Sequence, residues 1–261
     1  MTARSSQETV RLADGVSIPL IGFGTWELDG DDAYNGARAA LDIGYRHIDT
    51  ATAYGNEGRV GAAVRDSGIG RENVFITTKC PPGRVGREAQ TLDASLKALG
   101  VDFVDLWLIH WPPNGEARPD TWKAFIAALE QGKTRAIGVS NYSIAQIDEL
   151  IAATSRGPAL NQIPWNPFLF NEREVAELES RDVVLEGYSP LKRSDLGNPV
   201  LAEIAAAHSK TAAQIILRWH VEHGFVVLPR SQRRERIEEN FAIFDFELTP
   251  EELRRLDALG A

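Results

Sequence analysis

The chain has 261 residues, of which 43% are hydrophobic and 25% charged, a balance typical of a folded protein and not of a disordered one. Its formal net charge of −9 argues against a surface that binds nucleic acid or acidic membranes. The single cysteine, Cys80, excludes an internal disulfide and a zinc site built from cysteines.

The N-terminal part of the chain predicts a β-hairpin. Residues 1–8 are polar and lack the apolar core of a signal peptide, and no apolar stretch could cross a bilayer, so we expect a cytoplasmic protein. Thr9–Leu12 and Val16–Leu20 flank Asp14-Gly15, a dipeptide that accepts positive φ in a tight turn.

Short apolar runs and amphipathic stretches alternate through the rest of the chain. Runs of this kind are typical of buried parallel strands, and they predict strands over Ile21–Thr25, Tyr45–Ile48, Val74–Thr78, Leu106–Ile109, Ala136–Val139, Ala159–Asn161, Val183–Gly187 and Phe225–Pro229. The i, i+3, i+4 spacing of apolar residues predicts helices over Asp32–Ile43, Glu57–Ser67, Arg87–Leu99, Thr121–Gln131, Ile144–Ala153, Asn171–Ser180, Thr211–Glu222 and Pro250–Leu259.

This alternation, with no composition shift or linker, predicts one α/β domain over residues 1–261. Eight units favour a closed (α/β)8 TIM barrel, with the N-terminal hairpin closing its bottom. An open doubly wound sheet is the alternative. It is disfavoured because Gly22-Phe23-Gly24-Thr25 lacks the third glycine of a dinucleotide-binding fingerprint.

Seven of the predicted strands end on polar residues that can bind or react: Asp49, Lys79, His110, Ser140 with Asn141, Gln162, Tyr188, and Arg230 with Ser231. In a parallel barrel the carboxyl ends of all strands open on one face, where the chemistry is done. We therefore expect these side chains to gather in one mouth.

Four of the groups near this mouth can together protonate a carbonyl oxygen. A tyrosine hydroxyl such as that of Tyr54 has an ordinary pKa of about 10, which a nearby Lys79 cation should lower. A buried Lys79 needs a counter-ion, for which Asp49 is the candidate, and His110 could orient the substrate. Taken singly, each residue has an alternative structural role. Asp49 could cap a helix, and Tyr54 could be a loop aromatic. Lys79 could extend to solvent, and His110 could be a core histidine. Four such groups at strand ends make those alternatives weaker.

Several motifs resemble, in the correct order, those of the aldo-keto reductase family. They are Gly44–Ala51 (GYRHIDTA) with Tyr54–Glu57 (YGNE), Leu108–Pro112 (LIHWP), Ile137–Tyr142 (IGVSNY), and Leu228–Ser231 (LPRS) with Arg236–Asn240 (RIEEN). The resemblance extends from about Val10 to Leu259 and is nearest to the prokaryotic branch that includes 2,5-diketo-D-gluconate reductases.

The resemblance implies an NADPH-dependent oxidoreductase that reduces aldehydes and ketones to alcohols by hydride transfer from nicotinamide, without a metal. It implies Tyr54 as the general acid, Lys79 and Asp49 as its tuners, and His110 as the residue that orients the substrate. Trp26 and Trp111 would line the substrate pocket with Tyr54 and His110. From the resemblance and from side-chain chemistry together, the expected cofactor contacts are Thr25, Trp26, Asp49, Ser140, Asn141, Gln162, Tyr188, Arg230, Ser231, Arg236, Glu239 and Asn240.

Four arginines, Arg230, Arg233, Arg234 and Arg236, crowd into one short segment of an acidic chain. A guanidinium grips phosphate in a bidentate manner, so we expect Arg230 and Arg236 to meet the 2′-phosphate of NADPH, with the other two in solvent. A solvated helix face is the alternative. The family often has lysine in place of Arg230, and NADH could serve as a weaker substitute.

Two other functions stay open at this point. A nicotinamide-binding redox sensor with little turnover would need a partner surface, which the sequence does not display. An aldolase that forms a Schiff base at Lys79 has no further support, and paired metal ligands are missing from the strand ends. We expect a monomer whose partner is a small carbonyl compound.

Overall fold

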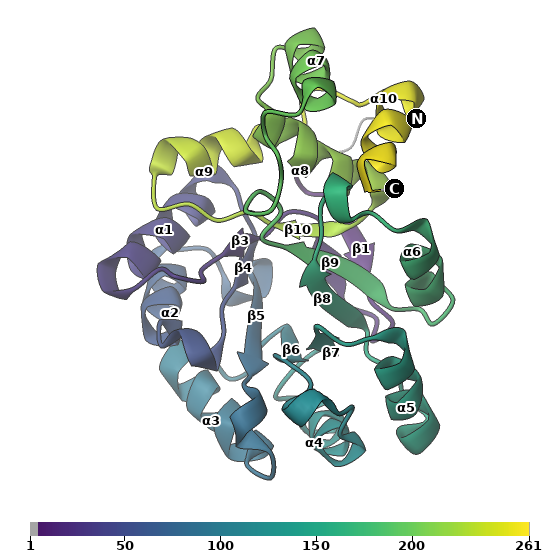
Figure 1. The fold of residues 1–261 in the computed structure, drawn as a ribbon. Helices are drawn as coiled ribbons and strands as arrows, with labels where there is room; N and C mark the ends of the chain where they lie inside the picture. The colour runs from purple at the N-terminus through teal and green to yellow at the C-terminus, as the bar shows by residue number, and fades with distance from the viewer. Residues whose placement is uncertain (1–4, 261) are drawn as a thin grey trace.

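Eight strands pair in parallel in chain order in the computed structural model, which describes residues 5–260. Residues 1–4 and 261, the two ends of the predicted domain, lie outside the described residues. The strands of this sheet are β3 (Phe23–Gly24), β4 (His47–Asp49), β5 (Phe75–Cys80), β6 (Leu106–Ile109), β7 (Ile137–Ser140), β8 (Leu160–Pro164), β9 (Val184–Tyr188) and β10 (Val226–Leu228). Figure 1 shows them grouped at the centre with the helices around them.

The first and last strands meet and close the sheet. The amide of Gly22 donates to the carbonyl of Val227 at 2.9 Å, and the amide of Val227 donates to the carbonyl of Leu20 at 2.8 Å. This closure confirms the predicted (α/β)8 TIM barrel. All strand ends that carry the candidate site residues therefore open on the same face.

Helices follow the strands as the apolar spacing predicted, and two further helices were missed. The helices are α1 (Gly30–Ile43), α2 (Glu57–Asp66), α3 (Glu88–Leu99), α4 (Pro119–Glu130), α5 (Ile144–Thr154), α6 (Glu172–Glu179), α7 (Pro199–His208), α8 (Ala212–His223), α9 (Arg234–Phe241) and α10 (Pro250–Asp257). Short 3-10 turns are η1 (Thr52–Tyr54), η2 (Arg71–Asn73), η3 (Pro82–Arg84), η4 (Pro113–Gly115), η5 (Pro167–Leu169) and η6 (Ala258–Gly260). The missed helices are α7 and α9. The first is rich in alanine and the second in charge, so neither shows a clear apolar stripe. Within residues 5–260, no helix is long and apolar enough to cross a membrane.

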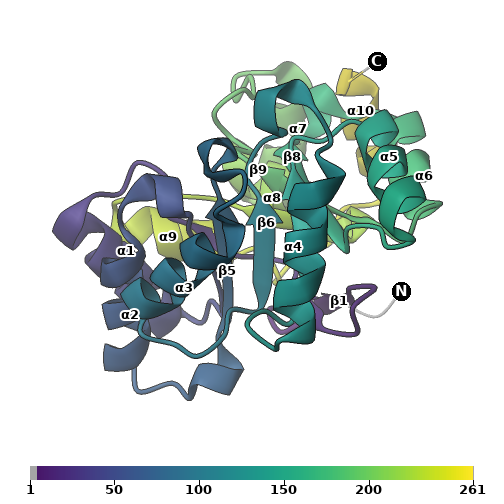
Figure 2. The same ribbon diagram turned by 90° about the horizontal axis from the view of Figure 1, so that it is seen from below.

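The N-terminal hairpin, β1 (Thr9–Arg11) and β2 (Ser17–Pro19), lies at the end of the barrel opposite the site, as Figure 2 shows for β1. Gly15 turns it with a φ of +86°, which explains the Asp-Gly signal in the sequence. Asp14 ties it to the barrel, since its carboxylate accepts the amide of Ile137 at 3.0 Å and pairs with Arg156.

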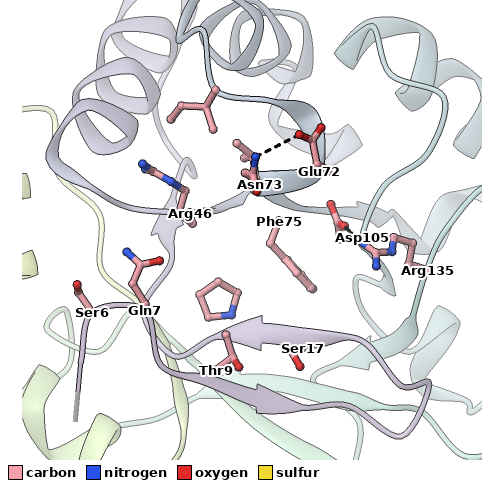
Figure 3. A pocket seen from close by; sticks show the side chains of 13 residues that line it. Ser6, Gln7, Thr9, Ser17, Arg46, Glu72, Asn73, Phe75, Asp105 and Arg135 are labelled. Carbon is pink, nitrogen blue, oxygen red and sulfur yellow. Dashed lines mark hydrogen bonds and ion pairs between the residues drawn. The ribbon is translucent and has the colours of Figure 1, made fainter. Parts of the chain in front are cut away.

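A polar hollow of about 410 Å³ remains between the hairpin and the amino ends of the strands. In Figure 3 the hairpin runs along one side of it, with Arg46, Asp105 and Arg135 across from Thr9 and Ser17. This hollow is at the bottom of the barrel and takes no part in the candidate site.

Candidate active site

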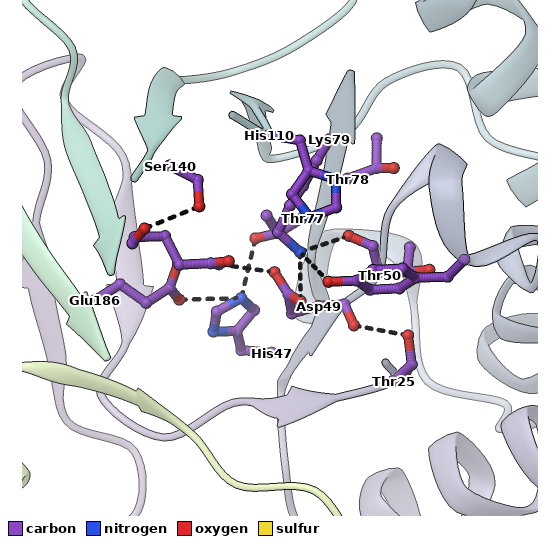
Figure 4. Close-up of polar contacts among 12 residues, drawn as sticks. Thr25, His47, Asp49, Thr50, Thr77, Thr78, Lys79, His110, Ser140 and Glu186 are labelled. Atoms are coloured by element: carbon purple, nitrogen blue, oxygen red, sulfur yellow. Dashed lines mark hydrogen bonds and ion pairs between the residues drawn. The ribbon is translucent and has the colours of Figure 1, made fainter. Parts of the chain in front are cut away.

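An ion pair lies at the carboxyl ends of β4 and β5. Asp49 is the last residue of β4 and pairs with Thr77 in the strand register, which places it beside Lys79. The Lys79 ammonium is 2.6 Å from Asp49 Oδ1 and also donates to the carbonyl of Thr50 at 2.8 Å (Figure 4). Lys79 is fully buried, and an ammonium is tolerated there because a carboxylate and a carbonyl satisfy it.

Tyr54 is placed over this pair by a short turn. It ends η1, and Gly55 reverses the chain with a φ of +68°, a conformation in which glycine carries no steric cost. Asn56 braces the turn, since its side chain donates to the carbonyl of Thr25 and accepts the Thr50 hydroxyl. The Tyr54 hydroxyl is 3.5 Å from Lys79 Nζ, so the two predicted partners do come together.

The electrostatics of Tyr54 differ from the expectation drawn from sequence. Lys79 lowers the pKa of Tyr54 as expected, but burial raises it more, and Asp49 adds to the rise. The net pKa of Tyr54 is therefore above its ordinary value, and the hydroxyl keeps its proton at neutral pH. The effect of Lys79 is as expected, and the net rise comes from burial, which the sequence alone does not reveal. In Lys79 the balance differs: burial lowers its pKa, but Asp49, Tyr54 and Glu186 together outweigh burial and the pKa is raised.

His110 follows β6 and lies against Tyr54. Their rings are 5.6 Å apart, edge to face. Burial, with help from the Lys79 charge, lowers the pKa of His110 to about 3. The imidazole is thus neutral across the physiological range and can donate one hydrogen bond without adding a charge.

The opposite side of the mouth carries amide and aromatic groups from β7, β8 and β9. Asn141 Oδ1 accepts the Tyr188 hydroxyl at 2.8 Å, and Asn141 Nδ2 donates to the carbonyl of His110 at 3.2 Å. The Ser140 hydroxyl donates to the carbonyl of Gln162 at 2.8 Å. These contacts join the amide side to the Tyr54–His110 side, so the predicted residues share one mouth.

Gln162 connects two carboxyl groups. Its amide nitrogen donates to Asp49 Oδ2 at 3.0 Å and to Glu186 Oε2 at 2.8 Å. Both amide hydrogens are then used, which leaves Oε1 as the acceptor that this side chain can offer to a ligand. Thr25 is similarly committed, because its buried hydroxyl donates to the carbonyl of Asp49 at 2.9 Å.

The basic segment is divided between a loop and a helix. Arg230 turns back to the loop after β3, where its Nε donates to the carbonyl of Trp26 at 2.9 Å and its Nη2 pairs with Glu27 at 2.8 Å. Arg236 is exposed on α9 beside the exposed Arg233 and Arg234, and its contact with a phosphate stays a prediction. The two predicted aromatic walls, Trp26 and Trp111, are 43% and 48% exposed.

Three other residues predicted to contact the cofactor lie in the same C-terminal part of the chain. Ser231 is buried, and its hydroxyl accepts the amide of Arg233 at 3.1 Å. Glu239 accepts the Thr211 hydroxyl at 2.8 Å, and Asn240 is buried near the end of α9. Contact of these three residues with a cofactor stays a prediction.

Glu186 and His47 are buried polar groups that the sequence reasoning missed. Each is fully buried in the barrel interior, and both were counted as part of an apolar strand. The available signal was an ionisable residue inside a strand covered on both faces, where charged side chains are rarely found without a partner.

The chemistry of these groups fits a nicotinamide ring. Gln162 Oε1 and the Asn141 amide suit a carboxamide, the half-buried Tyr188 presents an aromatic face, and exposed arginines lie at the next strand end. Lys79 does not fit a Schiff-base role, because its ammonium is committed to Asp49 and to a carbonyl. Among residues 5–260 no group of three or more His, Cys, Asp or Glu could hold a metal ion.

The chain is similar to known proteins over nearly its whole length. A sequence model of the aldo/keto reductase family matches residues 20–261. The chain is 40% identical over 260 residues to a glyoxal reductase of Bacillus subtilis (strain 168), covering 98% of this chain and 94% of that protein. It is 38% identical over 268 residues to morphine 6-dehydrogenase of Pseudomonas putida, covering 96% and 90%. The crystal structure of an aldo/keto reductase from Brucella melitensis matches with a TM-score of 0.94 at 42% identity, over 99% of each chain.

Proposed function

The chain belongs to the aldo/keto reductase family, and from that premise we propose that it reduces aldehydes and ketones with NADPH, using Tyr54 as the general acid. The observation that carries this proposal is the position of the Tyr54 hydroxyl, 3.5 Å from a buried ammonium that is itself 2.6 Å from a carboxylate. Bound NADPH supplies the hydride that adds to the carbonyl carbon. The side chains of this protein stabilise and neutralise the negative charge that then develops on the carbonyl oxygen.

Tyr54 donates its proton to the carbonyl oxygen as that oxygen gains charge. Its raised pKa keeps the hydroxyl protonated until an alkoxide, a far stronger base, forms next to it. The Lys79 ammonium stabilises the phenolate that remains, and Asp49 keeps Lys79 charged and in place. The neutral His110 orients the substrate by donating a hydrogen bond to the same oxygen.

On the cofactor side, we propose that Ser140, Asn141 and Gln162 hold the carboxamide while Tyr188 stacks on the ring. Trp26 and Trp111 would line the substrate pocket. We propose that Arg230, Ser231 and Arg236 bind the 2′-phosphate, and that Glu239 and Asn240 bind the adenine end. This phosphate contact supports NADPH over NADH, which would bind more weakly. A single domain over residues 1–261, a monomeric state and a cytoplasmic location stay predictions from the sequence.

The test is NADPH oxidation against a panel of aldehydes, ketones and dicarbonyls, with glyoxal included because one relative is named a glyoxal reductase. Tyr54→Phe should bind NADPH as the wild type does and lose about 100-fold or more in turnover, the usual contribution of a general acid. Tyr34→Phe is the matched control, since Tyr34 lies on α1, away from the strand ends, and bonds Asp66. Equal turnover by Tyr54→Phe would remove it from the mechanism. NADPH binding without turnover of any carbonyl would favour a regulatory module.

A further inference from the structure

A second buried carboxyl group is bonded to Gln162, one of the residues proposed to hold the nicotinamide. Glu186, in the middle of β9, is fully buried and accepts the Gln162 amide through Oε2 at 2.8 Å. Its other oxygen, Oε1, has no hydrogen-bond partner among the described residues and lies 3.8 Å from His47 Nε2 (Figure 4). A buried polar atom without a partner is costly, so this group needs an explanation beyond packing.

The charges around Glu186 do not balance if it is ionised. The titratable groups that face it are His47 and Asp49 on β4 and Lys79 on β5, while Gln162 on β8 and the paired residues of β10 carry no charge. The one ammonium is committed to Asp49 at 2.6 Å. His47 cannot supply a positive charge, because burial and the Lys79 charge lower its pKa to about 3.

The same imbalance explains how Glu186 is tolerated. Burial raises the pKa of Glu186 to about 8, and repulsion from Asp49 contributes to the rise. At neutral pH the site therefore holds one ammonium, one carboxylate and one neutral acid, with no net charge. Any new positive charge beside Gln162 would change that balance.

Such a charge is a property of the cofactor that the proposed function requires. The reduced nicotinamide ring is uncharged, and the oxidised ring carries one positive charge. We propose that Glu186 is a positioning residue that acts through Gln162 and balances the cofactor charge, as a neutral acid with NADPH bound and as a carboxylate with NADP⁺ bound. Binding of NADP⁺ then releases up to one proton from the Glu186 carboxyl to solvent, and no electron is transferred in that step. This inference rests on the proposed use of NADPH.

The proposal predicts a pH dependence that separates the two cofactor forms. An opposite charge nearby lowers the pKa of an acid by about one unit or more. The affinity for NADP⁺ should therefore rise about tenfold relative to that for NADPH as the pH increases through about 8, where free Glu186 ionises. Titration of the 2′-phosphate cancels in the ratio, because both forms carry it.

The experiment measures the dissociation constants of NADPH and NADP⁺ over this pH range in wild type, Glu186→Gln and Glu57→Gln. Glutamine at position 186 keeps an acceptor for Gln162 but cannot ionise, so the ratio should become independent of pH. Glu57 is a matched control: it is buried beside the site and has a raised pKa, but it accepts the Thr78 hydroxyl rather than Gln162. Glu57→Gln should keep the wild-type slope. If Glu186→Gln fails to fold, infrared difference spectra of the wild type should show the protonated carboxyl band disappear when NADP⁺ replaces NADPH.

A pH-independent ratio in the wild type, or a pH dependence that persists in Glu186→Gln, overturns the role of Glu186. Binding of both cofactors with the expected slope but no carbonyl turnover would contradict the proposed function and leave the charge balance supported. Failure to bind either cofactor overturns both.

Discussion

Replacing Asp49 by asparagine should destabilise the protein severely, because it removes the carboxylate that is 2.6 Å from the buried Lys79 ammonium. Lys79 is fully buried, and after the change the oxygens near its nitrogen would all be neutral: the new amide oxygen at position 49, the Thr50 carbonyl at 2.8 Å and the Tyr54 hydroxyl at 3.5 Å. Removing one partner of a buried pair costs about 3–5 kcal/mol of unfolding free energy. We expect Asp49→Asn to lose about that amount at pH 7.

Chemical denaturation monitored by far-UV circular dichroism measures this loss, and a surface pair serves as the control. Lys133 and Asp93 are as close, at 2.6 Å, but their side chains are 33% and 55% exposed, so Asp93→Asn should cost less than about 1 kcal/mol. The double variant Asp49→Asn/Lys79→Met should recover part of the loss, since it removes the unpaired charge.

The pH dependence of the Asp49→Asn defect provides a second check. In the wild type the pKa of Lys79 is raised, so its contribution is present below the unfolded pKa and is lost as the pH rises through the folded value. In the variant the buried amine has a depressed pKa, and stability rises with pH from that depressed value up to the unfolded one. The difference between the two proteins should therefore shrink in alkali. A loss below about 1 kcal/mol at pH 7, or a difference that does not change with pH, would refute the reasoning.

Three further predictions concern other parts of the molecule. Gly138→Ala should destabilise by about 1–3 kcal/mol in denaturant titrations, because the new Cβ would lie 2.6 Å from the Leu160 carbonyl; a neutral result would mean that the strands can separate. Glu27→Gln should tighten NADPH binding about two- to fivefold and leave NADH binding unchanged, because it frees Arg230 from a 2.8 Å ion pair; equal effects on both cofactors would count against a phosphate contact at Arg230. Burial raises the pKa of Glu252, but hydrogen bonds with Thr249 and His208 outweigh burial and lower that pKa. The stabilisation from Glu252 is therefore present above the unfolded pKa of 4.5 and is lost in acid. Thermal melts of Glu252→Gln should thus fall below wild type at neutral pH and converge with it as the pH drops; a constant difference would contradict this.

The barrel could be predicted from local pattern because its strands and helices are close to repeating units. Runs such as Leu106–Ile109 are buried on both faces and carry an unbroken apolar signal, and the strand there has the predicted bounds. The helices α7 and α9 were not predicted, because their burial depends on neighbouring elements and not on an apolar stripe in their own sequence. A helix such as Pro199–His208 still carried a start signal, since Asn198 caps it and proline occupies its first position.

The residues that gather at the mouth follow from residue type and strand order alone, because the carboxyl ends of parallel strands must share one face. Asp49, Lys79 and His110 come together for that reason, and no knowledge of distances was needed to expect it. The charge state of the site is a different matter. It depends on burial and on contacts between segments far apart in the chain, such as the bond from Gln162 to Asp49 across 113 positions. The upward shift of the Tyr54 pKa and the unpaired Oε1 of Glu186 therefore became visible only in three dimensions, where solvent exclusion and through-space charge can be compared.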